Sequence, residues 1–287
     1  MRKIYVLFKP LAGDGACEAK AKALSSLYAD CEMEYLDITG ITDYGALVAA
    51  LDPGDALLIC GGDGTLNRFI NDTYALGIEN EILYYAAGSG NDFLRDLGKP
   101  DDAPPFPIND YIASLPTVTV DGVTRFFLNG IGYGIDGYCC EVGDRLRGKG
   151  KKPNYALIAI GGLLGGYHPT GATVTVDGKT KSYKKTWIAP TMYGRFYGGG
   201  MMPTPAQDRT GTGKTVTFAA IHDSGKLRTL CVFPSIFKGD HVRHTKMVDV
   251  MEGHEVTVEF DRPTALQIDG ETILGGTKYH VPSCSPR

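Results

Sequence analysis

The stretch that decides the fold of this 287-residue chain is ALLICGGDGT, residues 56–65. Its first five residues, Ala56–Cys60, form an uninterrupted apolar run, which is typical of a strand buried on both faces of a sheet. Gly61 and Gly62 then let the backbone approach a ligand closely, and a run of helical composition, Thr65–Leu76, follows. A helix that begins here offers free amides and the positive end of its dipole to an anion. The stretch therefore predicts a strand, a glycine turn and a helix that together cradle a phosphate.

A second glycine turn follows the next predicted strand. The sequence ILYYAAGSGND, residues 82–92, begins with the apolar run Ile82–Ala87 and ends in Asn91 and Asp92. Because consecutive strand ends of a parallel sheet lie side by side, we expect this turn to face the first one. Its polar side chains would then lie where Mg²⁺ and phosphates meet. Taken singly, the first turn is also compatible with an ordinary strand-to-helix connection and the second with a helix cap, but the pair favours a phosphate site.

Residues 1–97 alternate short apolar runs with helical patterns, which predicts an α/β fold with a Rossmann-like parallel sheet covered by helices on both sides. A proline-rich stretch, KPDDAPPFPIND at residues 99–110, indicates a linker or a domain rim. We therefore predict a first domain over residues 1–115, ending in a short helix at Tyr111–Leu115. Its other predicted strands are Ile4–Phe8 and Cys31–Leu36, and its other predicted helices are Ala16–Tyr28 and Tyr44–Leu51.

From residue 116 onward the sequence changes to short runs rich in Thr, Val and aromatic residues. The Asp-Gly pairs at residues 121–122 and 177–178 favour hairpin turns, because both turn positions need positive φ. We predict an antiparallel β-sandwich over residues 116–287, whose last few residues return to the first domain. The predicted strands are Thr117–Val120, Phe126–Asn129, Thr173–Val176, Tyr183–Ala189, Thr215–Ile221, Glu255–Phe260 and Ala265–Ile268.

Composition and charge narrow the class of protein. There are 29 Lys and Arg against 33 Asp and Glu, a net charge of −4, which argues against a general nucleic-acid binder. Seven cysteines with no CxxC pair are typical of a chain in a reducing cytosol, where most act as small buried hydrophobes. The longest uncharged stretch, Tyr155–Tyr167, is shorter than the about 20 apolar residues that span a bilayer. We therefore expect a cytoplasmic protein.

Together, the two glycine turns resemble those of the diacylglycerol/sphingosine lipid-kinase family, which shares its nucleotide-binding fold with NAD kinases and phosphofructokinases. The resemblance extends in the right order over almost the whole chain. GGDGT alone is shared with the wider fold, whereas GSGND and IDGE are specific to the lipid-kinase branch. The matching segments are GGDGTLN (Gly61–Asn67), GSGNDFLR (Gly88–Arg95), FLNGIGYGIDG (Phe127–Gly137), GGG (Gly198–Gly200) and QIDGE (Gln267–Glu271).

This resemblance implies an enzyme that transfers the γ-phosphate of ATP, with Mg²⁺, to the hydroxyl of diacylglycerol or a related lipid. It implies Asp269 as the general base with Glu271 beside it, and it places Asp63 near the metal. From the local residues alone, Asp269-Gly270 is equally a type I′ turn after the strand Ala265–Ile268. By the same match, the ATP site would consist of Gly61, Gly62, Gly64, Thr65 and Asn67 in the first turn and Gly88, Ser89, Asn91 and Asp92 in the second.

The chain departs from the family pattern at several places, two of which bear on its activity. Arg68 stands where the family usually has Glu, and the stretch PTPAQDRTGTGK, residues 203–214, matches the family's second metal loop poorly, with Asp208 as a substitute ligand. These departures motivate one alternative, a non-catalytic regulator that binds a nucleotide or a lipid. The other alternative is an NAD-kinase-like phosphotransferase with a soluble acceptor, which would share the GGDG turn.

One charged segment bears on the lipid. RLRGKGKK, residues 145–152, holds five basic residues, and the apolar run Tyr155–Gly166 follows directly. These residues form either a solvated loop or a side of the second domain that contacts anionic head groups of a membrane. Exposed edge strands of the β domain would also permit two copies of the chain to pair as a homodimer.

Overall fold

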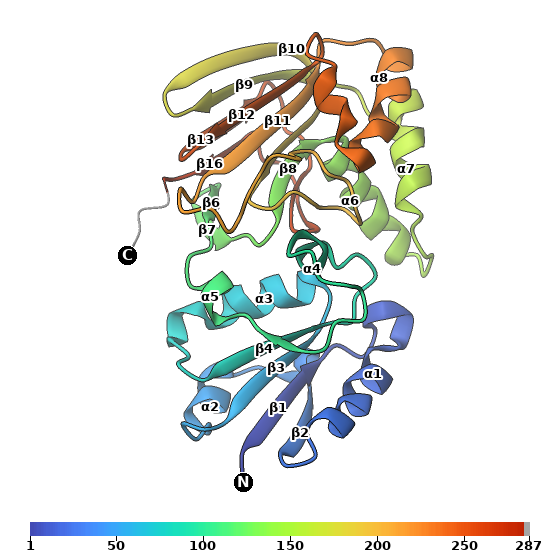
Figure 1. Cartoon of the computed structure of the whole chain (residues 1–287). Coiled ribbons are helices and arrows are strands. Elements are labelled where there is room, and N and C mark those ends of the chain that lie inside the picture. Colours follow the sequence, from blue (N-terminus) through green and yellow to red (C-terminus); the bar gives the residue numbers. More distant parts are fainter. Residues whose placement is uncertain (284–287) are drawn as a thin grey trace. The chain divides into compact units, whose positions relative to one another are not determined.

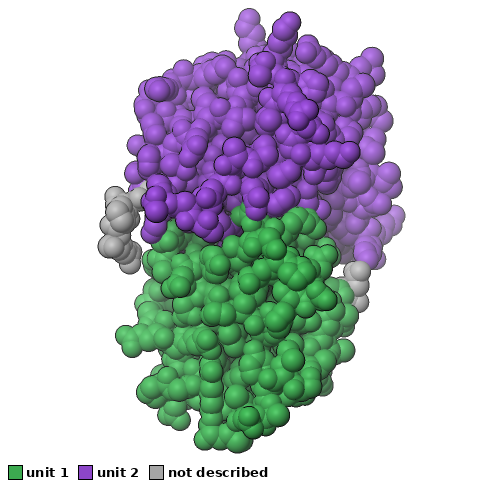
Figure 2. Space-filling view, viewed as in Figure 1, with its two compact units in different colours: residues 1–115 green, residues 116–287 purple. Residues whose placement is uncertain are grey.

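A computed structural model describes residues 1–283 (Figure 1). The chain divides into two compact units, Met1–Leu115 and Pro116–Arg287 (Figure 2). Cys284, and the last few residues that were expected to return to the first domain, lie outside the described residues. Each unit has its own sheet and core, and the two are described in turn.

Unit 1 is an α/β unit in which strands and helices alternate along the chain. Its strands are β1 (Lys3–Phe8), β2 (Glu32–Asp37), β3 (Ala56–Gly61), β4 (Glu81–Ala86) and β5 (Phe106–Pro107). Its helices are α1 (Cys17–Ala23), α2 (Tyr44–Ala49), α3 (Asp63–Thr73), α4 (Asp92–Asp96) and α5 (Asn109–Ile112), with short turns η1 (Ala12–Gly15), η2 (Leu24–Leu27), η3 (Ile38–Gly40) and η4 (Tyr74–Leu76).

The sheet of unit 1 confirms the predicted parallel architecture. Its order is β2-β1-β3-β4-β5, and the first four strands are parallel, while β5 pairs antiparallel with β4 at the edge. Every residue of β3 is buried, as its continuous apolar run predicts. Helix α1 covers one face of the sheet, where Cys17 and Ala21 pack against Val6 and Leu58, and α2 and α3 lie over the other face (Figure 1).

The helix boundaries of unit 1 differ from the predicted ones by a few residues. The run predicted as Ala16–Tyr28 is α1 followed by the 3₁₀ turn η2. The short helix predicted at Tyr111–Leu115 is α5, which begins at Asn109. Helix α3 begins at Asp63, two residues before the predicted start, so this aspartate belongs to the first helical turn.

Unit 2 is mainly antiparallel sheet. Its strands are β6 (Thr117–Val120), β7 (Val123–Phe126), β8 (Gly130–Gly134), β9 (Thr170–Val176), β10 (Lys179–Met192), β11 (Val216–His222), β12 (Val248–Gly253), β13 (Val256–Phe260), β14 (Leu266–Ile268), β15 (Glu271–Ile273) and β16 (Lys278–Val281). Its helical segments are α6 (Ile135–Arg147), α7 (Tyr155–Gly161), the π-helical turn η5 (Gly162–Gly166), α8 (Lys226–Val232), η6 (Phe233–Lys238) and η7 (Asp240–Arg243).

The strands of unit 2 form one curled, eleven-stranded sheet, which confirms the predicted antiparallel β domain. Its main order is β15-β14-β8-β10-β9-β13-β16-β6-β7, and β11 and β12 extend it from β10. The predicted Asp-Gly hairpins are also confirmed, since φ is 49° and 80° at Asp121 and Gly122 and 46° and 77° at Asp177 and Gly178. Helices α6, α7 and α8 lie together at one side of this sheet, over a core that contains Trp187 (Figure 1).

Several features of unit 2 differ from the sequence prediction. The predicted strand Phe126–Asn129 is wrong, because β7 ends at Phe126 and β8 begins at Gly130, and the amides between them are donated elsewhere. Strand β8, GIGYG, went unpredicted because glycine has a low strand propensity, although all five of its residues are buried. Unit 2 also contains more helices than the few that its composition suggests. No helix within residues 1–283 has the length and apolar character needed to cross a bilayer.

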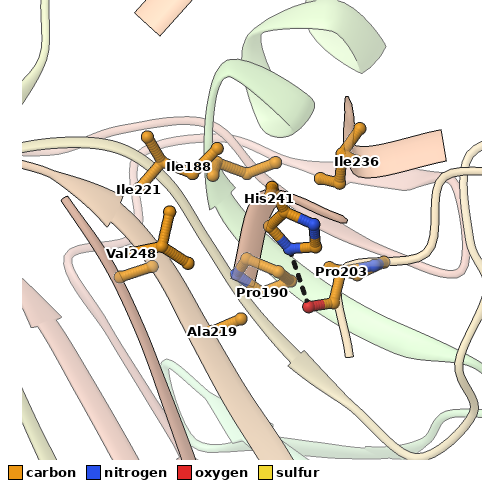
Figure 3. Close-up of a pocket in the computed structure, with 9 residues that line it drawn as sticks. Ile188, Pro190, Pro203, Ala219, Ile221, Ile236, His241 and Val248 are labelled. Atoms are coloured by element: carbon orange, nitrogen blue, oxygen red, sulfur yellow. Dashed lines mark hydrogen bonds between the residues drawn. The ribbon is translucent and has the colours of Figure 1, made fainter. Parts of the chain in front are cut away.

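A small apolar pocket lies in unit 2, and Figure 3 shows His241 beside the backbone oxygen of Pro203 at its rim. The Nε2 atom of His241 is 3.0 Å from that oxygen, and burial lowers the pKa of this imidazole. About 170 Å³ of empty space is too little for a nucleotide or a diacylglycerol. The pocket therefore does not mark the substrate site. Its lining residues are Ile188, Pro190, Pro203, Ala219, Ala220, Ile221, Ile236, His241 and Val248.

Candidate active site

The two glycine turns of unit 1 lie against each other. A Cβ atom on Gly88 would come within 2.4 Å of the Cα atom of Gly62, so Gly88 has no room for a side chain. Gly13 approaches the same region, where its Cβ would lie 2.3 Å from the backbone oxygen of Ala87. The ends of β3 and β4 thus bring the two turns together, as a parallel sheet requires of neighbouring strands.

Asp63 ties the first turn to the second. Its Oδ2 atom accepts a hydrogen bond of 2.7 Å from the backbone amide of Asp92, and its Oδ1 atom accepts one of 3.3 Å from the amide of Phe93. These amides open α4 and have no intrahelical partner, so a carboxylate stabilises them. The carboxylate that the family resemblance places near the metal therefore also fixes the spacing of the two turns.

The first turn presents the beginning of α3. The backbone oxygen of Gly62 accepts hydrogen bonds from the amides of Thr65 (2.9 Å) and Leu66 (3.1 Å), which starts the helix immediately after the glycines. A Cβ on Gly61 would lie 2.7 Å from the Cβ of Thr65, so the turn is closed by close packing of this threonine. The first amides of an eleven-residue helix at this position can bind phosphate oxygens.

The second turn presents a polar atom that lacks a partner. Asn91 adopts the left-handed conformation, with φ of 49°, and its Nδ2 donates to the backbone oxygen of Gly88 at 3.1 Å. Its Oδ1 is buried and has no hydrogen-bond partner among residues 1–283. Asp92 is 3% exposed and forms an ion pair of 3.1 Å with Arg95. An unsatisfied buried oxygen beside two glycine backbones fits a ligand that brings a donor or a cation.

The remaining predicted nucleotide residues of unit 1 fall into two groups. Asn67 is buried and its Oδ1 accepts a hydrogen bond of 3.1 Å from Asn71, so it supports α3 from inside. Gly64, in the first turn of α3, and Ser89, in the second glycine turn, are both exposed. Within residues 1–283, no group of three or more His, Cys, Asp or Glu side chains is arranged to hold a metal ion. Mg²⁺ in proteins that act on nucleotides usually takes several of its ligands from phosphates and water.

Arg68, the departure next to the first turn, points into solvent. Its side chain is 83% exposed and forms an ion pair of 3.5 Å with Asp72, one helical turn further along α3. An exposed pair of this kind contributes little to stability and leaves the glycine turn unchanged. Arg68 therefore pairs with a residue of its own helix.

Asp269 lies in unit 2, in the turn between β14 and β15. Its φ of 45° and the φ of 87° at Gly270 are those of a type I′ turn, so the local hairpin interpretation is correct. Its carboxylate also accepts backbone hydrogen bonds from Leu128, from Asn129 at 2.8 Å and from Gly130 at 3.1 Å. These three donors fix the orientation of the carboxylate.

Arg209 is a residue of this region that the sequence did not reveal. Its guanidinium donates to the backbone oxygen of Leu128 at 3.2 Å and to Oδ1 of Asn129 at 2.8 Å, and only 8% of the residue is exposed. It thus holds from behind the same segment that donates to Asp269. A buried arginine in an otherwise unremarkable polar loop has no local sequence signature, because its partners lie 80 residues away.

The other predicted residues of unit 2 lie nearer the surface. Glu271 is exposed and forms an ion pair of 2.9 Å with Arg125 across the sheet. Asp208, the substitute metal ligand, is exposed, and its Oδ1 accepts hydrogen bonds from the amide and the hydroxyl of Thr210. These bonds hold the pKa of Asp208 below its usual value. Asp208 closes a local turn, and within residues 1–283 it belongs to no group of three or more His, Cys, Asp or Glu side chains that could hold a metal ion.

Asp136 is a second residue that sequence reasoning missed. It lies in the first turn of α6, is 5% exposed, and has a buried Oδ1 without a partner among residues 1–283. Burial raises the pKa of this carboxyl to about 7, against hydrogen bonds that act in the opposite direction. The hydroxyl of Tyr197 donates to its Oδ2 at 3.4 Å. The signal available in the sequence was an aspartate two residues after the glycine-rich stretch that forms β8.

The contact between the glycine turns predicts the effect of one substitution in unit 1. Gly88→Ala would force a Cβ against the backbone of Gly62, so we expect about 1–3 kcal/mol of destabilisation and weaker ATP binding. Gly54→Ala is the matched control, because a Cβ there meets nothing within 4 Å. Calorimetric titration with ATP and thermal unfolding of both variants test this. Equal ATP affinity in the two variants would contradict a nucleotide site at this contact.

Both units match families of known proteins. Residues 3–118 match the family model described as the diacylglycerol kinase catalytic domain, and residues 129–286 match the one described as the YegS C-terminal NAD kinase beta sandwich-like domain. The diacylglycerol kinases of two Mycobacterium tuberculosis strains, CDC 1551 and H37Rv, are each 28% identical over 252 residues, which cover 84% of this chain and 80% of theirs. A crystal structure of a diacylglycerol kinase from Bacillus anthracis shares the fold, with a TM-score of 0.59, 17% identity, and coverage of 98% of this chain and 94% of that one.

Proposed function

Since the chain belongs to the diacylglycerol/lipid kinase family, we propose that it transfers the γ-phosphate of ATP to the hydroxyl of diacylglycerol or a related lipid at the cytosolic face of a membrane. The observation that supports this most directly is the pair of glycine turns joined by Asp63 at the ends of β3 and β4. Such a pair offers backbone amides and close backbone approach to a polyphosphate. The alternatives, a soluble acceptor or binding without turnover, are outcomes of the same experiment.

In this proposal, unit 1 binds the nucleotide. In the proposal, the first amides of α3 and the backbone of Gly61, Gly62 and Gly64 bind the phosphates, and the unpartnered Oδ1 of Asn91 faces the ligand from the other turn. Mg²⁺ bound with ATP would neutralise charge on the phosphates, which is where most of the catalysis of phosphoryl transfer arises. Asp63 keeps the two turns at a constant spacing while the nucleotide enters and leaves.

Asp269 is the general base in this proposal. Its ionised carboxylate accepts the proton of the acceptor hydroxyl while the oxygen bonds to the γ-phosphorus and the bond to ADP breaks. The backbone amides of residues 128–130 orient the carboxylate before the reaction, so no solvent has to reorganise around it. Arg209 supports the backbone segment that carries these amides.

A transfer assay with radiolabelled ATP tests the proposed function. The acceptors are mixed micelles that each contain diacylglycerol, monoacylglycerol, sphingosine or ceramide, with NAD as the soluble acceptor in a separate reaction. We expect label in the organic phase with a glycerolipid and none after Mg²⁺ is removed with a chelator. Label on NAD alone would favour the NAD-kinase-like alternative, and ATP binding without label in any acceptor would favour the non-catalytic regulator.

A further inference from the structure

The outer face of α7 in unit 2 is apolar and exposed. Leu157, Ile160 and Leu164 are 65%, 45% and 60% exposed, and their spacing of three and four residues places them on one side of the helix and its π-helical extension. Ile158 and Leu163 lie on the inner side and pack against the core of unit 2. The segment therefore has two apolar faces, and only one of them is used by the fold.

Helix α8 begins beside the end of this segment and carries another exposed leucine. The Nζ atom of Lys226 lies 3.8 Å from the position of a Cβ on Gly165, so the start of α8 adjoins the end of η5, as the two neighbouring helices in Figure 1 also show. Leu227 is 77% exposed, the largest value for a leucine after Leu11. Monomeric proteins seldom expose several large aliphatic side chains in one contiguous area without a partner for them.

Basic side chains border the apolar face. Helix α6 ends in Arg147, whose Nη1 donates to the hydroxyl of Tyr155 at 2.6 Å and thereby fixes the basic segment to the first turn of α7. Arg145 and Arg147 form ion pairs within α6. The segment beyond the helix, residues 148–154, contains three lysines and no acidic residue. The chain as a whole carries a net charge of −4, so this concentration of positive charge is local. The exposed lysines are Lys149, Lys151, Lys152 and Lys226.

We infer that this surface, defined by Leu157, Ile160, Leu164 and Leu227 with the lysines at 149, 151, 152 and 226, binds the anionic surface of a lipid bilayer. Aliphatic side chains on one helix face enter the acyl boundary, and the surrounding lysines contact the head groups. The charge selects anionic over zwitterionic lipid. The inference deepens the proposed function, because it identifies the surface through which a lipid acceptor would be reached.

Vesicle flotation tests the basic part of this surface. Vesicles of phosphatidylcholine with about one third phosphatidylglycerol, and vesicles of phosphatidylcholine alone, are mixed with the full chain in the absence of ATP. Reversing three charges replaces attraction to an anionic surface by repulsion, so the triple variant Lys149→Glu, Lys151→Glu, Lys152→Glu should bind anionic vesicles at least about tenfold less. The matched control changes three exposed lysines of β10, Lys179, Lys184 and Lys185, to Glu and should bind within about twofold of the wild type.

The apolar side chains of this surface are tested with a separate variant. Leu157→Ser with Leu164→Ser should weaken binding at least about tenfold, because two exposed leucines would no longer enter the bilayer. Leu27→Ser with Val123→Ser, at positions 59% and 55% exposed elsewhere, serves as the control. Fluorescence of the single tryptophan, Trp187, verifies that unit 2 of each variant remains folded.

The outcomes separate this inference from the proposed function. It is overturned if the wild type does not float with anionic vesicles, or if both surface variants float as their controls do. Flotation requires no phosphoryl transfer, so normal binding with no labelled lipid would contradict the kinase proposal alone. Labelled lipid in micelles together with unchanged flotation of the variants would contradict the membrane surface alone.

Discussion

Asp269→Asn is expected to lower the rate of phosphoryl transfer to lipid by about 10²–10⁴-fold, the usual contribution of a positioned general base. Asparagine keeps the size of the side chain and can keep the two backbone hydrogen bonds that Oδ1 accepts from Asn129 and Gly130. It loses the bond from Leu128 and, above all, the negative charge that takes up the proton of the acceptor. The measurement is kcat with radiolabelled ATP and the best lipid of the acceptor panel.

Asp177→Asn provides the matched control. Asp177 also precedes a glycine in a type I′ turn of unit 2, and its Oδ1 accepts backbone hydrogen bonds from His254 at 2.9 Å and Glu255 at 2.8 Å. Both substitutions thus remove a carboxylate from the same kind of turn. If Asp269 acts only as a turn residue, the two variants will retain similar kcat values, and the role as general base must be abandoned.

Asp136→Asn is expected to stabilise unit 2 at alkaline pH and to have little effect at acidic pH. The pKa of Asp136 in the folded chain is about 7, because burial disfavours the charged form. The pKa of a carboxyl in an unfolded chain is about 4. The folded state therefore binds the proton more tightly, and stability is lost as the pH rises from about 4 through about 7. A difference of about three pKa units corresponds to about 4 kcal/mol in the free energy of unfolding.

The readout for this prediction is denaturant unfolding at several pH values, followed by Trp187 fluorescence. Trp187 is the only tryptophan of the chain and lies in the core of unit 2 together with Ile135, the neighbour of Asp136, so it reports on the unit that contains the substitution. Asp144→Asn is the control on the same helix. Hydrogen bonds from Thr272 and Arg147 lower the pKa of Asp144 despite partial burial, so its loss should not stabilise at any pH. If the free energies of unfolding of the wild type and of Asp136→Asn change with pH in the same way, folding does not raise the pKa of Asp136 and the prediction is wrong.

Much of unit 1 was predictable from local sequence. The apolar run of β3 is buried on both faces, and its glycine turn must fit between two packed elements, so composition and spacing alone identify both. Unit 2 was predicted less well at β8, since glycines carry no strand signal of their own. There, Gly132 is required because a Cβ would collide with the side chain of Asp136, a contact that local sequence does not reveal.

By itself, the sequence determined the four parallel strands of unit 1 and most of its helices, the two glycine turns, the antiparallel character of unit 2 and the family. These features depend on residues close together in the chain, whose periodicity and backbone freedom are local properties. The tertiary structure alone decided that Asp63 caps α4, that Asp269 accepts three amides from residues 128–130, and that Asp136 is buried. Each of these features depends on residues that folding brings together. Hydrogen bonding and burial are set by the packing of the whole chain and cannot be inferred from the few residues next to each site in the sequence.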